Sequence, residues 1–150
     1  MKILLAIDDS KFSQAAIQAV LAQAHTKDTE VRVLHIVVPP SLLVSREMGG
    51  PDPALEAIWE KETEHAQALV AKAADALRPH IMKVTSAVAQ GDPKSLIIDA
   101  AEEWHADLIV LGSHGRNSLD RFLMGSVSDA IVRHAHCSVE VVRISTRKPS

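Results

Sequence analysis

The segment GSHGRNSLDRFLMGS, residues 112–126, combines the residue types that bind a phosphate group. Two residues separate Gly112 from Gly115, nine more precede Gly125, and Ser126 follows directly. Glycine lets a bulky anion approach the main chain because no Cβ stands in the way, but it also serves ordinary tight turns. The spacing therefore predicts either a turn or a phosphate-binding loop.

The end of this segment leads into SVSDAIVRHA, which predicts a helix over residues 126–135. The first N–H groups of a helix have no partner within the helix, and the positive end of its dipole favours phosphate. The hydroxyls of Ser126 and Ser128 can add donors, and Arg116 or Arg121 could add charge. A glycine turn followed by an ordinary serine cap is the alternative.

Other chemistries have weaker support in the sequence. The patterns GxxxxGK[ST] and GxGxxG are absent, which argues against P-loop and dinucleotide-binding sites. His134, His136 and Cys137 match no zinc-binding spacing, so we interpret the histidines as surface or helix-end residues and the cysteine as a small buried residue. His114 could act as a base, but no partner is visible in the sequence, and a contact within the loop is preferred.

The elements that must position this loop alternate between strand and helix patterns. Apolar or β-branched runs predict strands over residues 2–7, 30–38, 82–89, 107–111 and 138–144. Apolar residues at helical spacing predict helices over residues 11–25, 53–78, 93–104 and 126–135. Such alternation is typical of a parallel sheet covered by helices on both faces.

Capping signals support these boundaries. Ser10 can cap the first helix, and Asp52 with Pro53 can start the long second one, which Pro79 must end. Gly91-Asp92-Pro93 starts a helix in the same way. The intervening PPSLLVSREMGGPD predicts a long irregular loop.

Ligands of parallel α/β sheets bind beyond the carboxyl ends of the strands, where the winding direction reverses. Two loops have suitable chemistry for that place: Asp8-Asp9-Ser10 after the first strand, and the glycine loop after the fourth.

Composition sets outer bounds on function. The 150 residues predict a single domain, and 47% hydrophobic with 23% charged residues is ordinary for a globular protein. The net charge of −3 gives no electrostatic case for nucleic acid. A single cysteine favours a reducing compartment, and no apolar run reaches the roughly 20 residues that span a bilayer. We therefore expect a cytoplasmic protein with neither a membrane nor a nucleic acid as its partner.

Three stretches carry a resemblance to the universal stress protein family: LLAIDDS, GDPKSLIIDAAEEWHADLIVLGSHG and MGSVSDAIVRHAHCSVEVVR. The likeness covers essentially the whole chain. It implies an open, Rossmann-like α/β sandwich of five parallel strands in the order 3-2-1-4-5, with helices on both faces. It also implies an ATP site in the crevice between the loops after strands one and four.

The resemblance assigns roles in that site. Asp8 is expected to accept from the ribose hydroxyls, although capping of the following helix is an alternative, and main-chain groups near Ile36 are expected to hold adenine. Asp9 stands where many relatives have glycine, so a second carboxylate could weaken phosphate binding or recruit a divalent ion. The expected nucleotide-binding residues are Ala6, Ile7, Asp8, Ile36, Leu111, Gly112, Ser113, His114, Gly115, Arg116, Gly125, Ser126, Val127 and Ser128.

The implied function is a cytosolic stress-response protein that binds ATP, or AMP or ADP, with Mg or Mn carried by the phosphates. It would act as a nucleotide-dependent regulator without an assigned catalytic residue. A slow ATPase at the same site is one alternative, and a dimeric interaction module without nucleotide is another. The family commonly forms homodimers through the fifth strand, which is expected here at residues 137–144.

Overall fold

A computed structural model describes residues 1–24, 26–39, 53–115 and 124–144 of the chain. Its five strands form one sheet in which every neighbouring pair is parallel. The strands are β1 (Lys2–Ala6), β2 (Glu30–Val37), β3 (Lys83–Gln90), β4 (Leu108–Gly112) and β5 (Ser138–Val142). Their order, β3-β2-β1-β4-β5, confirms the fold expected from the sequence.

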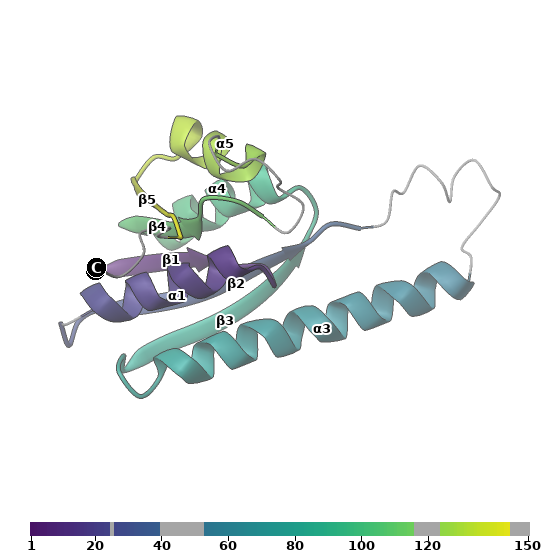
Figure 1. The fold of residues 1–150 in the computed structure, drawn as a ribbon, viewed down its shortest axis with the longest axis horizontal. Helices are drawn as coiled ribbons and strands as arrows, with labels where there is room; N and C mark the ends of the chain where they lie inside the picture. Colours follow the sequence, from purple (N-terminus) through teal and green to yellow (C-terminus); the bar gives the residue numbers. More distant parts are fainter. Residues whose placement is uncertain (25, 40–52, 116–123, 145–150) are drawn as a thin grey trace, which may run out of the picture.

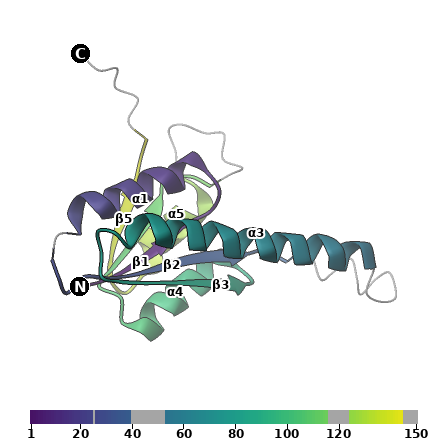
Figure 2. The ribbon, with the colours of Figure 1, turned by 90° about the horizontal axis from the view of Figure 1, so that it is seen from below.

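Helices cover both faces of the sheet (Figure 1). Within the described residues they are α1 (Lys11–Gln23), α3 (Pro53–Leu77), α4 (Pro93–Trp104) and α5 (Ser126–His134). One core cluster joins α1 and α3 to one face, and a second joins α4 and α5 to the other. Figure 2 shows α1 and α3 together on one side of the strands, with α4 on the opposite side.

The central strand β1 is apolar because both of its faces are covered. Ile3 and Leu5 point into the cluster beneath α1 and α3, while Leu4 and Ala6 point toward α4 and α5. All four are at most 8% exposed. An alternating side-chain direction with helices on each side thus requires a continuous apolar run, as the sequence predicted.

The predicted helix starts are confirmed where they are described. The Ser10 side chain accepts a hydrogen bond from the Ser13 N–H at 3.3 Å, and Asp92 accepts from Ser95 at 3.2 Å. Gly91 has a φ of 143°, a backbone angle that favours glycine. The predicted cap at Asp52 lies outside the described residues.

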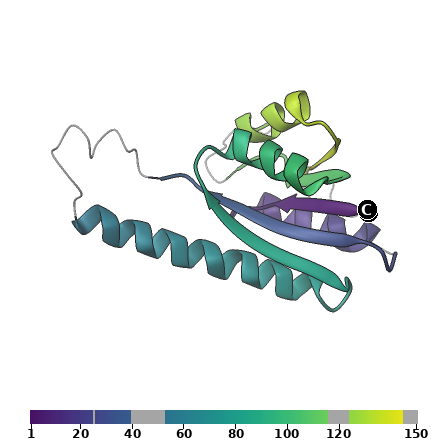
Figure 3. The same cartoon turned by 180° about the vertical axis from the view of Figure 1, so that it is seen from behind.

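Most element ends differ from prediction by one or two residues, the ordinary uncertainty of such boundaries. The larger difference is in the long helix α3, whose apolar stripe is buried only toward its carboxyl end, from Ala66 to Leu77. Ile58, in the first half, is 52% exposed. Figures 1 and 3 show why: this half extends past the carboxyl ends of the strands.

Candidate functional site

A cleft of about 680 Å³ opens at the carboxyl ends of β1, β2 and β4. The strand order explains the position of the cleft. The chain adds β2 and β3 on one side of β1 and then continues with β4 and β5 on the other side. Ala6 of β1 is in register with Leu34 of β2 and with Leu111 of β4, so the loops that follow start at the same level. The cleft thus lies at the switch point where α/β sheets bind ligands.

The structure brings most of the expected site residues to this cleft. Those that line it are Ala6, Ile7, Asp8, Ile36, Leu111, Gly112, His114, Gly115, Gly125, Ser126, Val127 and Ser128. Ser113 is buried, at 2% exposure, and is not among the lining residues. Arg116 and Arg121 lie outside the described residues.

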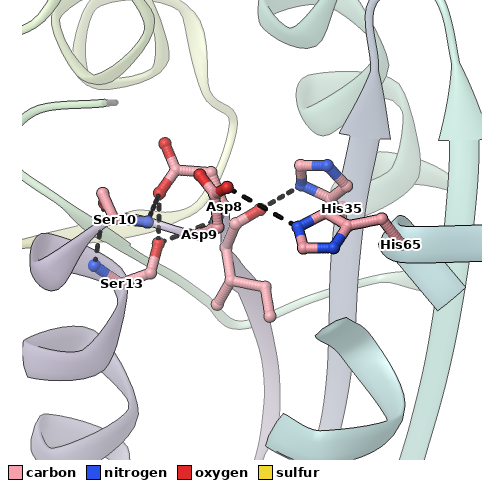
Figure 4. A network of polar contacts seen from close by, with 7 residues as sticks. Asp8, Asp9, Ser10, Ser13, His35 and His65 are labelled. Atoms are coloured by element: carbon pink, nitrogen blue, oxygen red, sulfur yellow. Dashed lines mark hydrogen bonds and ion pairs between the residues drawn. The ribbon is translucent and has the colours of Figure 1, made fainter. Parts of the chain in front are cut away.

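Asp8 uses one carboxylate oxygen to hold its own loop (Figure 4). Its Oδ1 accepts from the Ser10 N–H at 2.9 Å and from the Ser13 hydroxyl at 2.8 Å. The Asp8 N–H in turn donates to the Ser13 hydroxyl oxygen at 2.8 Å. The other oxygen, Oδ2, faces Gly115, where an added Cβ would lie 3.3 Å from it. The two readings of Asp8, fixing the helix start and accepting from a ligand, are therefore compatible because they use different oxygens.

The glycines of the loop are not there for unusual backbone angles. Among the described glycines only Gly91 has a positive φ. At Gly112 an added Cβ would lie 2.7 Å from Phe12 Cβ and 2.9 Å from the Phe12 carbonyl oxygen, so glycine lets α1 pack against β4. Gly115, by contrast, faces Asp8 across the cleft. The motif therefore combines a packing requirement at its first glycine with a close approach to a cleft carboxylate at its second.

Hydrogen bonds close the loop at its base. The Gly125 N–H donates to the Ser113 carbonyl oxygen at 2.8 Å. The Ser128 hydroxyl lies 2.8 Å from the same oxygen and 3.0 Å from the Gly125 carbonyl oxygen. A hydroxyl has a single proton to donate, so in this conformation Ser128 holds the loop together rather than offering a donor to the cleft.

The start of α5 faces the cleft through Ser126 and Val127. Gly125 occupies the N-cap position without a side-chain hydrogen bond to the first turn. The N–H groups at a helix start carry a partial positive charge and can bind an anion. The Asp129 carboxylate in that turn is paired with Arg133, whose Nε lies 3.0 Å away.

His114 lies within the glycine loop and contacts Ser113 and Phe12. Its Nδ1 lies 3.0 Å from the Ser113 hydroxyl, and its ring centroid lies 5.1 Å from that of Phe12.

Apart from Ile36 of β2, sequence reasoning missed the part of the cleft wall that β2, α3 and α4 provide. The additional lining residues are Asp9, Ser13, Leu34, His35, Val37, Val38, Glu62, His65, Leu69, Pro93 and Ile97. Asp9 belongs to the loop that the sequence predicts at the ligand site, but it is not among the expected nucleotide-binding residues. The sequence gives no sign that residues of α3 line the cleft, because α3 is far from the glycine loop along the chain.

Two of these residues are histidines with defined contacts (Figure 4). His35 Nδ1 lies 2.6 Å from the Ile7 carbonyl oxygen. Because a carbonyl oxygen only accepts, Nδ1 carries a hydrogen and donates it to this contact. His65 Nε2 lies 3.6 Å from Asp9 Oδ2, a pair that is ionic when the imidazole is protonated.

The described residues contain no group of three or more His, Cys, Asp or Glu side chains arranged to hold a metal ion. His136, near Cys137, lies 4.0 Å from a Glu102 carboxylate oxygen and is exposed. Cys137 is half-buried rather than fully buried. Among all the described residues, no helix is long and apolar enough to cross a membrane.

Comparison with known proteins gives consistent matches. The model of the Universal stress protein family matches residues 1–143. A universal stress protein of Methanocaldococcus jannaschii, MJ0531, is 32% identical over 143 residues, which are 95% of this chain and 81% of that protein.

Solved structures agree. The structure of the protein MJ0577 matches with a TM-score of 0.81 at 29% identity, and the match covers 99% of this chain and 97% of that one. The universal stress protein UspA of Lactobacillus plantarum has a TM-score of 0.80 at 28% identity, covering 95% and 97%. Two more distant structures, at 20% and 17% identity, share the fold and contain a nucleotide. The first is a universal stress protein with cAMP (TM-score 0.71, 97% of this chain and 98% of that one), and the second is an Arabidopsis thaliana family member with AMP (TM-score 0.69, 97% and 93%).

Proposed function

This chain belongs to the universal stress protein family, and from that premise we propose that it binds an adenine nucleotide, ATP in the first place, in the cleft at the carboxyl ends of its strands. Nucleotide occupancy would then regulate how the protein engages a partner. The observation that carries the proposal is the meeting of Asp8 Oδ2 with Gly115 beside the start of α5. An acceptor suited to ribose hydroxyls would then lie next to N–H donors suited to phosphate.

The size and lining of the cleft suit such a ligand. A volume of about 680 Å³ falls within the roughly 300–1,000 Å³ of ordinary ligand pockets. Its apolar wall includes Ala6, Ile36, Ile97 and Leu111, which can cover a flat base. Main-chain groups near Ile36 would hold the edge of adenine, as expected from the resemblance.

The phosphates would lie between the glycine loop and α5. Backbone N–H groups near Gly115 and at Ser126 and Val127 would donate to them. A Mg or Mn ion would arrive bound to the phosphates, since the described residues offer no metal site of their own. The cAMP and AMP found in the two distant relatives support the adenine nucleotide class.

Mass spectrometry of small molecules released from the purified, denatured protein tests this proposal. We expect an adenine nucleotide in the released fraction. Calorimetric titration of nucleotide-free protein with ATP, ADP, AMP and cAMP, with GTP as control, ranks the ligands. If the protein retains no nucleotide and binds no adenine nucleotide measurably, the alternative of an interaction module without nucleotide is favoured.

We also propose that two copies pair through β5. This strand hydrogen-bonds to β4 along one side and lies at the end of the sheet. Unpaired strand edges invite pairing with another chain, and a two-fold axis makes such a contact self-complementary. Sedimentation at tens of micromolar distinguishes the expected dimer from a monomer. A cytoplasmic location stays a prediction from the sequence.

A further inference from the structure

The peptide group that joins Ile7 to Asp8 is held at both of its ends. Its carbonyl oxygen, on Ile7, lies 2.6 Å from His35 Nδ1 of β2. Its N–H, on Asp8, donates to the Ser13 hydroxyl oxygen of α1 at 2.8 Å. No cis peptide bond occurs among the described residues, so the carbonyl and the N–H of this peptide point in opposite directions. Figure 4 shows His35 and Ser13 on opposite sides of Asp8.

The side chain of His35 continues the connection between β1 and β2 beyond their last paired residues. The register of the two strands ends with Ala6 and Leu34. One residue further, the Ile7 N–H still donates to the Leu34 carbonyl oxygen at 2.9 Å. His35 then binds the Ile7 carbonyl oxygen through its imidazole. Asp8 follows directly, so its orientation depends on a side chain of β2 as well as on its own loop.

The direction of this peptide matters because the Asp8 side chain leaves the main chain one bond after the peptide nitrogen. Asp8 Oδ1 is bound within the loop, by the Ser10 N–H and the Ser13 hydroxyl. Asp8 Oδ2 faces Gly115 at the cleft. A hydrogen bond weakens steeply away from its preferred angle, so an oxygen that accepts from ribose hydroxyls needs a fixed direction.

We propose that His35 is a positioning residue for the ribose end of the cleft. By donating to the Ile7 carbonyl oxygen, it holds the peptide that sets the direction of Asp8 Oδ2. The consequence is selectivity for ribonucleotides over nucleotides whose sugar carries no hydroxyl at the 2′ and 3′ positions. This role requires no contact between His35 and the ligand. The inference rests on the proposed function and adds to it the residue that sets which class of nucleotide the site prefers.

Two substitutions of His35 match each other in shape and differ in the donor. His35→Asn places an amide nitrogen close to the position of Nδ1, since both nitrogens are bonded to Cγ. His35→Leu has the branched shape of asparagine without a donor. The wild type and both variants are titrated calorimetrically with ATP and with 2′,3′-dideoxy-ATP, and the ratio of the two affinities is the readout. Thermal melting checks that each variant is folded.

The wild type should bind ATP at least about tenfold more tightly than the dideoxy form, the scale of a hydrogen bond to a charged group. His35→Leu should lower this ratio about fivefold, the scale of one ordinary hydrogen bond, chiefly by weakening ATP. His35→Asn should keep most of the ratio, because its amide can donate in place of Nδ1. A general loosening of the cleft would instead weaken both nucleotides alike and leave the ratio unchanged.

An unchanged ratio in the folded His35→Leu protein would overturn the inference, and so would an equal loss in the leucine and asparagine variants. If the leucine variant does not fold, the wild type decides. A long-range proton–nitrogen NMR correlation, assigned to His35 by its absence from His35→Asn, should show a hydrogen on Nδ1. A ring with its hydrogen only on Nε2 would overturn the inference, because Nδ1 could not then donate.

The wild type also separates this inference from the proposed function. Equal affinity of the wild type for ATP and the dideoxy form would overturn the inference and leave the adenine-nucleotide site intact. If the wild type binds neither nucleotide, the proposed function fails, and the inference that rests on it fails with it.

Discussion

A Cβ atom added at Gly115 would lie 3.3 Å from Oδ2 of Asp8. The glycine loop after β4 therefore reaches the loop after β1, and the residue expected to bind ribose lies beside the one expected to admit phosphate. Gly112, three residues earlier, has a different neighbour, since an added Cβ would meet Phe12 of α1 at 2.7 Å. The first two glycines of one motif consequently predict different mutant phenotypes.

Substitution Gly115→Val should remove nucleotide binding from a folded protein. Gly115 is exposed, so its new side chain would occupy the cleft rather than the core. Losing even one charge-assisted hydrogen bond costs about 1.5–3 kcal/mol, or at least tenfold in affinity. Calorimetric titration with ATP measures the loss, and a thermal melt tests the fold. Unchanged ATP affinity in the folded variant would contradict the site assignment.

Substitution Gly112→Ala should instead lower the free energy of unfolding. The added Cβ would also lie 2.9 Å from the Phe12 carbonyl carbon and oxygen, so the backbone of α1 has to move. Overpacking of this kind costs about 1–3 kcal/mol. Denaturant unfolding measures it, and the further substitution Phe12→Ala should give no rescue, because alanine keeps the Cβ and backbone atoms that collide. A Gly112→Ala protein as stable as the wild type would argue against this packing role.

Substitutions at Asp8 and Ser13 should likewise have different effects, one on ligand binding and the other on stability. Asp8→Asn retains an oxygen that can accept from Ser10 and Ser13, but it can place an amide donor where Oδ2 faces the cleft. We expect lost affinity for both ATP and adenosine with little change in stability. Ser13→Ala, at a buried position, removes the acceptor of the Asp8 N–H and should destabilise the protein by about 1–3 kcal/mol. Equal stability losses in both variants would mean that Asp8 acts only through its loop.

Hydrolysis of bound ATP should be far slower than the roughly 10 per second of a typical enzyme. Fast phosphoryl transfer needs an oriented nucleophile, stabilisation of the charge on the transferring group and usually a bound metal ion. Backbone donors that bind the ground state and the transition state equally give affinity without rate. His114 contacts Ser113 and Phe12, so His114→Ala should change turnover little. Rapid magnesium-dependent hydrolysis that disappears in this variant would support the ATPase alternative.

Cys137 should react slowly with alkylating reagents at neutral pH. Burial of the thiol, with the nearby Asp107 carboxylate, raises its pKa above the ordinary value of 9.0. The thiolate is the reactive form, so iodoacetamide should label the native protein more slowly than the unfolded chain, and faster as pH rises. The neutral thiol is favoured in the fold, so its contribution to stability is present below 9.0 and is lost as pH rises through the raised pKa. Equal native and unfolded labelling rates at neutral pH would contradict this.

The sequence alone determined the elements and their type. Local signals are sufficient for that. A continuous apolar run predicts a strand that is buried on both faces, here β1. Ser10 or Asp92 followed by apolar residues at helical spacing predicts the start of a helix. The order of the strands came from family resemblance, because periodicity does not say which strands are neighbours. The two ligand-binding loops followed from a general rule of parallel sheets and from the residue types of the loops, and the resemblance implied the crevice between them.

Only the tertiary structure decided which side chains share the cleft and what each atom does there. The packing of α3 against the sheet brings His65 to Asp9, far apart in the chain. The close approach of α1 gives Gly112 its packing role. The Ser13 hydroxyl binds one carboxylate oxygen of Asp8, and the other oxygen faces Gly115 at the cleft. Such contacts depend on how whole elements pack together, so spacing along the chain records the residue types without recording their partners.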